Sequence, residues 1–180
     1  MTQPLPIIER RRIEAELLRE VYETLRAAHG TAEARRVIAE SVRRSAIAQA
    51  ARFAAEAPGG TSLQSFVDIQ SHWTAEDALE IEVVGRDETH FDFNVTRCRY
   101  AEMYREMGLA EIGPLLSCQR DGAFCEGYDP RLHMRRTQTI MGGASHCDFR
   151  YRYAAAEDGS AAATPVPPPG PAPDNEPGAP

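Results

Sequence analysis

The chain has 180 residues, of which 42% are hydrophobic and 26% are charged, with a formal net charge of −7 at pH 7. This composition is typical of a globular protein with one substantial core. The acidic balance argues against a nucleic-acid binder, which would present a basic face. No apolar stretch reaches the roughly 18–20 residues of a membrane span, and no secretory signal is visible. We therefore expect a cytoplasmic protein that binds neither nucleic acids nor membranes.

Two long helices are predicted in the N-terminal part. The first covers residues 6–29 and ends before Gly30, with apolar side chains at every fourth position. These side chains are Ile13, Leu17, Val21 and Leu25. The second begins at Thr31 and has a looser apolar stripe. This stripe consists of Ile38, Val42, Ala46, Ala50 and Phe53. The basic run of residues 10–12 is interpreted as a solvated face near a helix start.

The middle of the chain alternates between helical and extended patterns. A short helix is expected to begin at Thr61 or Ser62 and to end around Trp73, which would anchor the helical layer or, alternatively, line a pocket. The remaining expected elements are a hairpin over 79–95, helices over 100–107 and 110–119, an irregular segment over 121–130, and paired strands over 132–141 and 145–153. This order predicts an α+β fold, in which N-terminal helices pack on a small antiparallel sheet with helices inserted between hairpins.

The C-terminal residues 154–180 have a different composition. They contain eight of the thirteen prolines and no aromatic residue. Such a segment cannot bury enough apolar surface to offset the entropy of ordering it. We therefore expect one folded domain over residues 1–153 and a disordered tail.

The chain contains four cysteines and no lysine. The missing lysine excludes a Schiff-base mechanism and a P-loop phosphate site. Cys98, Cys118, Cys125 and Cys147 all lie in the second half, and no two of them have CxxC spacing. In a cytoplasmic protein such cysteines are expected to be free thiols that serve catalysis, metal binding or packing.

Residues 135–151 contain more reactive and polar groups than a purely structural hairpin needs. If 145–153 is a strand, alternate side chains point to opposite faces. Cys147 then lies on the apolar, buried face, whereas His146 and Asp148 point to the other one. These three residues therefore do not form a catalytic triad, and the partners of Cys147 must come from other segments.

The preceding predicted strand has polar side chains on both faces. Arg136 and Gln138 interrupt an otherwise apolar face, and Thr137 and Thr139 lie on the opposite one. Polar groups within a buried face either pair or line a cavity. The alternation alone does not decide which face meets a ligand.

Three roles for the cysteines remain open. A cysteine nucleophile needs a base or cation that favours the thiolate, and donors for the developing anion. Zinc bound by Cys98, Cys118, Cys147 and His146 is a second interpretation, although their spacing matches no compact zinc motif. In the third, the cysteines are small buried hydrophobic residues. Cys125, in a polar segment, is expected to be incidental.

Several short motifs follow one another in the second half. They are Arg-Cys-Arg-Tyr (97–100), Cys-Gln-Arg-Asp (118–121), Arg-Thr-Gln-Thr (136–139), Gly142-Gly143 and Cys-Asp-Phe (147–149). In this order and spacing, residues 79–153 resemble the L-2-amino-thiazoline-4-carboxylic acid hydrolase family. The preceding helices are compatible with this family but not diagnostic of it.

The resemblance implies hydrolytic opening of a small heterocycle that contains a C=N bond, giving a carbamoyl-type product. A thiolate or an activated water would add to the amidine carbon, and an acid would protonate the leaving heteroatom. A small-molecule substrate is then the expected partner, with no cofactor and no metal. The alternative is a non-catalytic small-ligand or metal-binding module on the same fold. The sequence leaves association into a homo-oligomer open.

By motif position, the resemblance also assigns site residues. Cys147 or Cys118 is expected to be the nucleophile, and Asp121 or His146 is expected to transfer protons. An arginine fork, from Arg136 or Arg97, would hold a substrate carboxylate. The expected substrate-binding residues are Arg136, Thr137, Thr139, Arg97 and Cys98.

Overall fold

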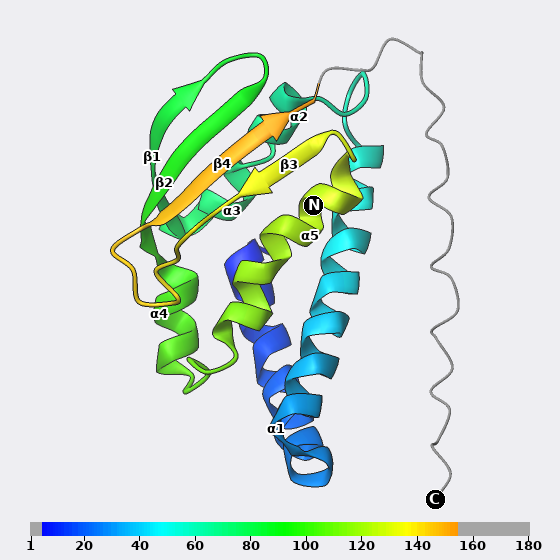
Figure 1. Ribbon diagram of the computed structural model, residues 1–180, viewed down its shortest axis with the longest axis vertical. Helices are drawn as coiled ribbons and strands as arrows, with labels where there is room; N and C mark the ends of the chain where they lie inside the picture. Colours follow the sequence, from blue (N-terminus) through cyan, green and yellow to red (C-terminus); the bar gives the residue numbers. More distant parts are fainter. Residues whose placement is uncertain (1–4, 155–180) are drawn as a thin grey trace, which may run out of the picture.

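The computed structural model describes residues 5–154, and Figure 1 shows a small sheet packed against helices. The helices are α1 (Ile7–Ala55), α2 (Leu63–Asp68), α3 (Ser71–Thr74), η1 (Ala75–Asp77), α4 (Arg99–Glu106), η2 (Pro114–Cys118) and α5 (Gln119–Tyr128). The strands are β1 (Leu79–Arg86), β2 (His90–Cys98), β3 (Leu132–Arg135) and β4 (Cys147–Tyr153). The sheet is antiparallel throughout, in the order β1-β2-β4-β3. The predicted α+β fold is confirmed.

Two further predictions concern membrane-spanning helices and the C-terminal tail. None of the helices within residues 5–154 is both long and apolar enough to cross a membrane. The predicted disordered tail, apart from Ala154, lies outside the described residues.

Helix α1 turns back on itself at Gly30, whose φ of 83° and ψ of 165° lie outside the helical region. Figure 1 shows the two halves side by side, in blue and cyan. The stripe predicted for the second half is buried apart from its half-buried last member. The stripe predicted for the first half is wrong, because Ile13 and Leu17 are 58% and 68% exposed. This half instead buries the face with Ala15 and Tyr22, since that face packs against the second half, α4 and η2.

The alternation of side chains in the central strands is confirmed. Phe93 and Val95 of β2 face the core and pair with Phe149 and Cys147 of β4, respectively. β-branched and aromatic residues that pair across strands stabilise such a sheet. Cys147 is only 6% exposed and points inward, as the alternation predicted.

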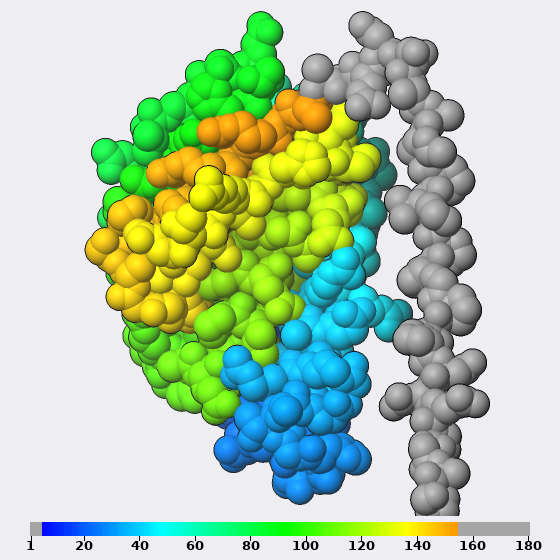
Figure 2. Space-filling view, viewed as in Figure 1, coloured from blue at the N-terminus to red at the C-terminus, as the bar shows by residue number. Residues whose placement is uncertain are grey.

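Strand β3 is shorter than predicted and ends at Arg135. The reason is a change of hydrogen-bond partner, because the N–H groups of Thr137 and Gln138 donate to the Asp148 side chain. Residues 136–146 therefore form a loop. Figure 2 shows this loop, in yellow to orange, as a continuous surface next to the ends of β3 and β4.

The segment predicted to be irregular, 121–130, is helical in α5 as far as Tyr128. Its glycines conceal the helix in the sequence, because glycine has a low helix propensity. One of them, Gly127, lies where α5 meets α1. A Cβ atom at Gly127 would lie 2.8 Å from the Cα of Ile47 and still closer to the Ile47 carbonyl oxygen. The close packing of α1 on α5 thus requires a glycine here.

We expect Gly127→Ala to lower the free energy of unfolding by about 1–3 kcal/mol, because the two helices must move apart. Gly122→Ala is the matched control in the same helix, since its Cβ would meet only the Met134 methyl at 3.7 Å. This control should stabilise the protein by about 0.5–1 kcal/mol through helix propensity. Urea denaturation of both variants measures the two effects, and equal shifts would contradict the close packing.

Candidate functional site

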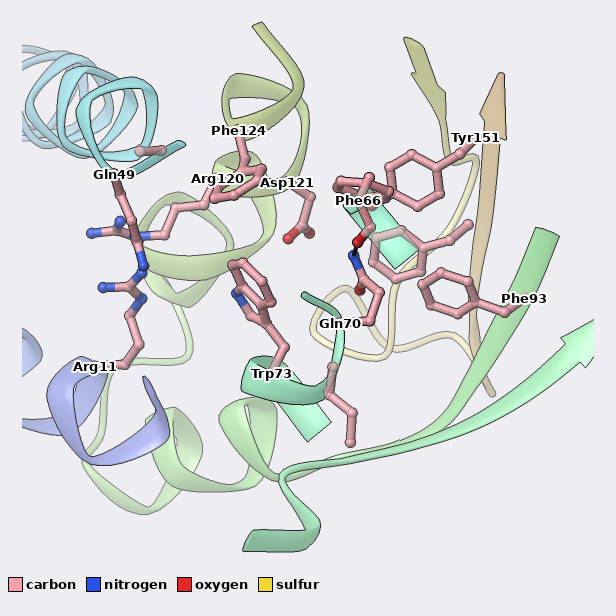
Figure 3. Close-up of a pocket in the computed structure, with 13 residues that line it drawn as sticks. Arg11, Gln49, Phe66, Gln70, Trp73, Phe93, Arg120, Asp121, Phe124 and Tyr151 are labelled. Carbon is pink, nitrogen blue, oxygen red and sulfur yellow. Dashed lines mark hydrogen bonds between the residues drawn. The ribbon is translucent and has the colours of Figure 1, made fainter. Parts of the chain in front are cut away.

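Two adjoining cavities of about 60 Å³ each lie between two apolar clusters. One cluster joins α1, α4 and η2, and the other joins the sheet to α2 and α5. Trp73, Leu79 and Cys98 pack against both clusters. The side chains that line both cavities are Arg11, Trp73, Leu79, Arg120, Asp121 and Phe149. Figure 3 shows the first cavity, with Phe66, Phe93 and Tyr151 on one side, the guanidinium groups of Arg11 and Arg120 on the other, and Trp73 between them.

The second cavity collects three cysteines from three elements. Cys98 ends β2, Cys118 ends η2 and Cys147 begins β4. The Ala101 N–H in the first turn of α4 donates to Sγ of Cys98 over 3.4 Å. The Ile140 N–H donates to Sγ of Cys147 over 3.2 Å. Hydrogen bonds of this kind favour a thiolate.

Asp121 and Arg136 form an ion pair in the wall of the second cavity. Nη1 of Arg136 lies 2.5 Å from Oδ2 of Asp121, and Nη2 donates to the Cys118 carbonyl over 2.8 Å. The same guanidinium lies 4.9 Å from the centre of the Phe149 ring. The Arg136 side chain is 12% exposed, and the Asp121 side chain, 29% exposed, lines both cavities. Arg136 is thus held by three contacts, and its charge is already paired.

Burial changes the protonation of the cavity groups. It raises the pKa of Cys98 to about 11 and that of Cys118 to about 12. Burial also raises the pKa of Cys147, although the Ile140 N–H and Arg136 oppose this rise. The pKa of the Asp121 carboxyl is raised by burial too, against the opposing effect of Arg136. The cavity therefore holds neutral thiols beside a carboxyl group that is easier to protonate than usual.

Asp148 fixes the loop that carries Arg136. Its Oδ1 accepts hydrogen bonds from the N–H groups of Thr137 and Gln138 over 2.9 and 2.8 Å, and the Thr137 hydroxyl donates to Oδ2 over 2.6 Å. Burial raises the pKa of Asp148, but these hydrogen bonds outweigh it and lower the pKa to about 2. Asp148 is therefore an ionised anchor for the loop.

The structure brings together five of the nine residues predicted for the site. They are Cys98, Cys118, Asp121, Arg136 and Cys147. Thr137 and Thr139 instead line an open depression of about 420 Å³, which shares Arg136 with the cavity. His146 hydrogen-bonds within the loop, to Gln138 and Ser145. Arg97 lies on the surface, where it forms ion pairs with glutamates.

The zinc interpretation has no ligand set in the structure. Within residues 5–154, no group of three or more His, Cys, Asp or Glu side chains is arranged to hold a metal ion. His146, the nitrogen ligand in that interpretation, does not line the cavity of the three cysteines.

Arg11, Arg120 and Trp73 line both cavities but were not predicted as site residues. Arg11 was expected on a solvated face, which is wrong, because its side chain is buried and contacts Gln49. Its spacing of four from Ile7 and Ala15 marks the buried face, but the neighbouring apolar stripe concealed this signal. Arg120 lies within the motif of residues 118–121. Trp73 was expected as an anchor, and it lines both cavities.

A comparison with protein-family models shows which family the chain belongs to. The model of the L-2-amino-thiazoline-4-carboxylic acid hydrolase family matches residues 10–151. The chain belongs to this family. The matched residues run from α1 to β4, so they include every residue that lines the two cavities.

The other comparisons are with curated proteins and with solved structures. No curated protein matches the sequence of this family member. Among solved structures, it is similar to the phenol-responsive sensory domain of the transcription activator PoxR, determined with phenol. The two share 15% sequence identity with a TM-score of 0.49, over 79% of this chain and 74% of that one.

Proposed function

We propose that this chain is a hydrolase that opens a small ring at a C=N or amide carbon, as in a cyclic amidine, a thiazoline or a cyclic amide. The observation that carries this proposal is the convergence of three thiols and the Asp121–Arg136 pair on one cavity. Membership of the family supports hydrolysis as the reaction type. The two cavities, of about 60 Å³ each, exclude a large substrate, since they are smaller than the engineered cavity of about 150 Å³ that holds benzene.

In this proposal Cys147 is the nucleophile, because the Ile140 N–H and Arg136 both favour its thiolate. Its pKa is nevertheless raised, so the thiol gives up its proton as it attacks, and the Asp121 carboxylate accepts that proton. The S–C bond forms while the π electrons of the protonated C=N group move to its nitrogen. Cys118 is the alternative nucleophile on the same cavity.

Asp121 then returns the proton to the ring heteroatom as the bond between that atom and the carbon breaks. A water molecule adds to the same carbon, and the Cys147 thiol leaves with one of the water protons. The raised pKa of Asp121 suits both steps, because burial makes this carboxylate a better proton acceptor than an exposed aspartate, while Arg136 opposes the rise. If an activated water attacks directly, Asp121 has the same role.

The test is ring opening of L-2-amino-thiazoline-4-carboxylate and of a five-membered cyclic amide, followed by mass spectrometry. We expect Cys147→Ala to lower turnover by at least about 100-fold, as removal of a nucleophile does in other hydrolases. Cys125→Ala is the matched control, because this cysteine is buried in α5 but does not line either cavity. Full turnover in both Cys147→Ala and Cys118→Ala would exclude the thiol route and leave the activated water.

A non-catalytic binding module is the second candidate. The raised pKa values of the cavity thiols favour it, because a resting thiolate is disfavoured in the unliganded protein. Binding of the substrates without any ring opening by the wild-type protein would support this candidate over the hydrolase.

A further inference from the structure

A second polar cluster borders the first cavity on the side of α1. Arg11, Gln49 and Arg120 are 4%, 5% and 7% exposed, respectively. Nη2 of Arg11 donates to Oε1 of Gln49 over 2.7 Å, and Nε of Arg120 donates to the Leu116 carbonyl over 3.0 Å. Figure 3 shows the three side chains gathered at one end of the cavity, opposite the rings of Phe66, Phe93 and Tyr151. We call these three side chains the guanidinium cluster.

The guanidinium cluster has more positive than negative charge. Arg11 and Arg120 share one carboxylate, that of Glu14, at distances of 2.6 and 3.2 Å. The carboxylate that lines the cavity, Asp121, is paired with Arg136. Burial and the neighbouring Arg11 lower the pKa of Arg120 to about 10, which reflects the cost of two close cations in the interior. An additional anion would relieve this repulsion.

The guanidinium cluster also has unused hydrogen-bond donors. Among residues 5–154, neither Nη1 of Arg120 nor Nε2 of Gln49 has a hydrogen-bond partner, although both atoms are buried. Buried polar groups are normally paired, so donors left over beside a cavity indicate an acceptor that enters it. Both residues line the first cavity. Two donors beside a surplus positive charge match the two oxygens of a carboxylate.

We propose that Arg11, Gln49 and Arg120 bind the carboxylate of the small ligand that occupies these cavities. The inference rests on the proposed function, because it assigns one end of that substrate. The arginines suggested by the sequence are less suitable, since Arg136 is paired with Asp121 and Arg97 with surface glutamates. The ring of the ligand then points toward Asp121, which lies between the guanidinium cluster and the aromatic rings in Figure 3.

The direct test uses a ligand that cannot react. Thiazolidine-4-carboxylate has a five-membered ring and a carboxylate but no C=N bond, and thiazolidine-4-carboxamide is its neutral counterpart. Titration calorimetry with the full chain should show binding of the carboxylate, and binding of the carboxamide that is roughly ten- to hundredfold weaker, as expected for loss of a charge-assisted hydrogen bond. Equal affinities, or no binding of the carboxylate, would overturn the proposal.

Two variants locate the carboxylate on the guanidinium cluster. Gln49→Glu places an internal carboxylate beside Arg11 and Arg120, so we expect a higher Tm without ligand and no preference for the carboxylate probe. Arg120→Gln should weaken carboxylate binding roughly tenfold or more. Arg12→Gln is the matched control, because it removes the same charge from an exposed side chain of α1. If Arg120→Gln does not fold, Gln49→Glu still decides, and a retained carboxylate preference in that variant would contradict the assignment.

The failure of this inference can be told apart from the failure of the proposed function. Carboxylate preference without ring opening would leave the guanidinium cluster as an anion site and reject the hydrolase. Ring opening without any preference between carboxylate and carboxamide probes would keep the hydrolase and reject the anion site.

Discussion

Replacing Asp121 with asparagine should lower turnover roughly 10²–10⁴-fold, the usual contribution of a positioned acid and base. The same change should also destabilise the protein by about 3 kcal/mol, because it leaves Arg136 buried without its partner. We take the lower end of the range for broken buried ion pairs, since part of the Asp121 surface lines the cavities.

A double variant separates the two effects of this carboxylate. In Asp121→Leu/Arg136→Met both charges are removed, and apolar replacements of a buried ion pair are often neutral or stabilising. We therefore expect stability near that of the wild type, measured by urea denaturation, together with turnover as low as in Asp121→Asn. Wild-type turnover in the double variant would mean that Asp121 transfers no proton. Wild-type stability of Asp121→Asn would mean that the ion pair is effectively solvated.

The second large effect concerns the reactivity of the cavity thiols. Because burial raises the pKa of Cys98 to about 11 and of Cys118 to about 12, their thiolate fractions at pH 7 are about 100- and 1000-fold below that of a thiol with the ordinary pKa of 9.0. Nucleophilicity increases with pKa and recovers about half of this loss on a logarithmic scale. We expect alkylation by iodoacetamide to be at least roughly tenfold slower than in the unfolded chain.

The pH dependence of this labelling shows whether the pKa of each thiol is raised or lowered. The rate for an ordinary thiol levels off above about pH 9, where the thiolate dominates. The rates for Cys98 and Cys118 should instead keep rising up to pH 10, since raised pKa values delay the formation of the thiolate. Quenched labelling followed by peptide mass spectrometry resolves each cysteine, and the chain in denaturant is the control. If the labelling rate of either cysteine in the folded protein levels off near pH 9, the pKa of that thiol is not raised, and the prediction for it is wrong.

The periodicity of the sequence predicted the elements that depend on local patterns. The break between two helices at Gly30, the stripe of the second helix and the inward direction of Cys147 follow from spacings of a few residues, which the backbone geometry converts into faces. The motifs of the second half likewise contained all five predicted residues that line the second cavity. Helix α5 was not predicted, because its glycines obscure a face that only packing on α1 stabilises.

Other features were decided by the tertiary structure. The first half of α1 has two faces that could be buried, and only its packing on α4 and η2 selects the face with Arg11 rather than the one with Leu17. The pairing of Arg136 with Asp121 and the exclusion of His146 from the cavity depend on the path of the loop 136–146. By itself, the sequence determined the fold class, the family motifs and the faces of the strands, because these depend on neighbouring residues. The convergence of charges from α1, α5 and the loop was decided by the tertiary structure, because it depends on how distant segments pack.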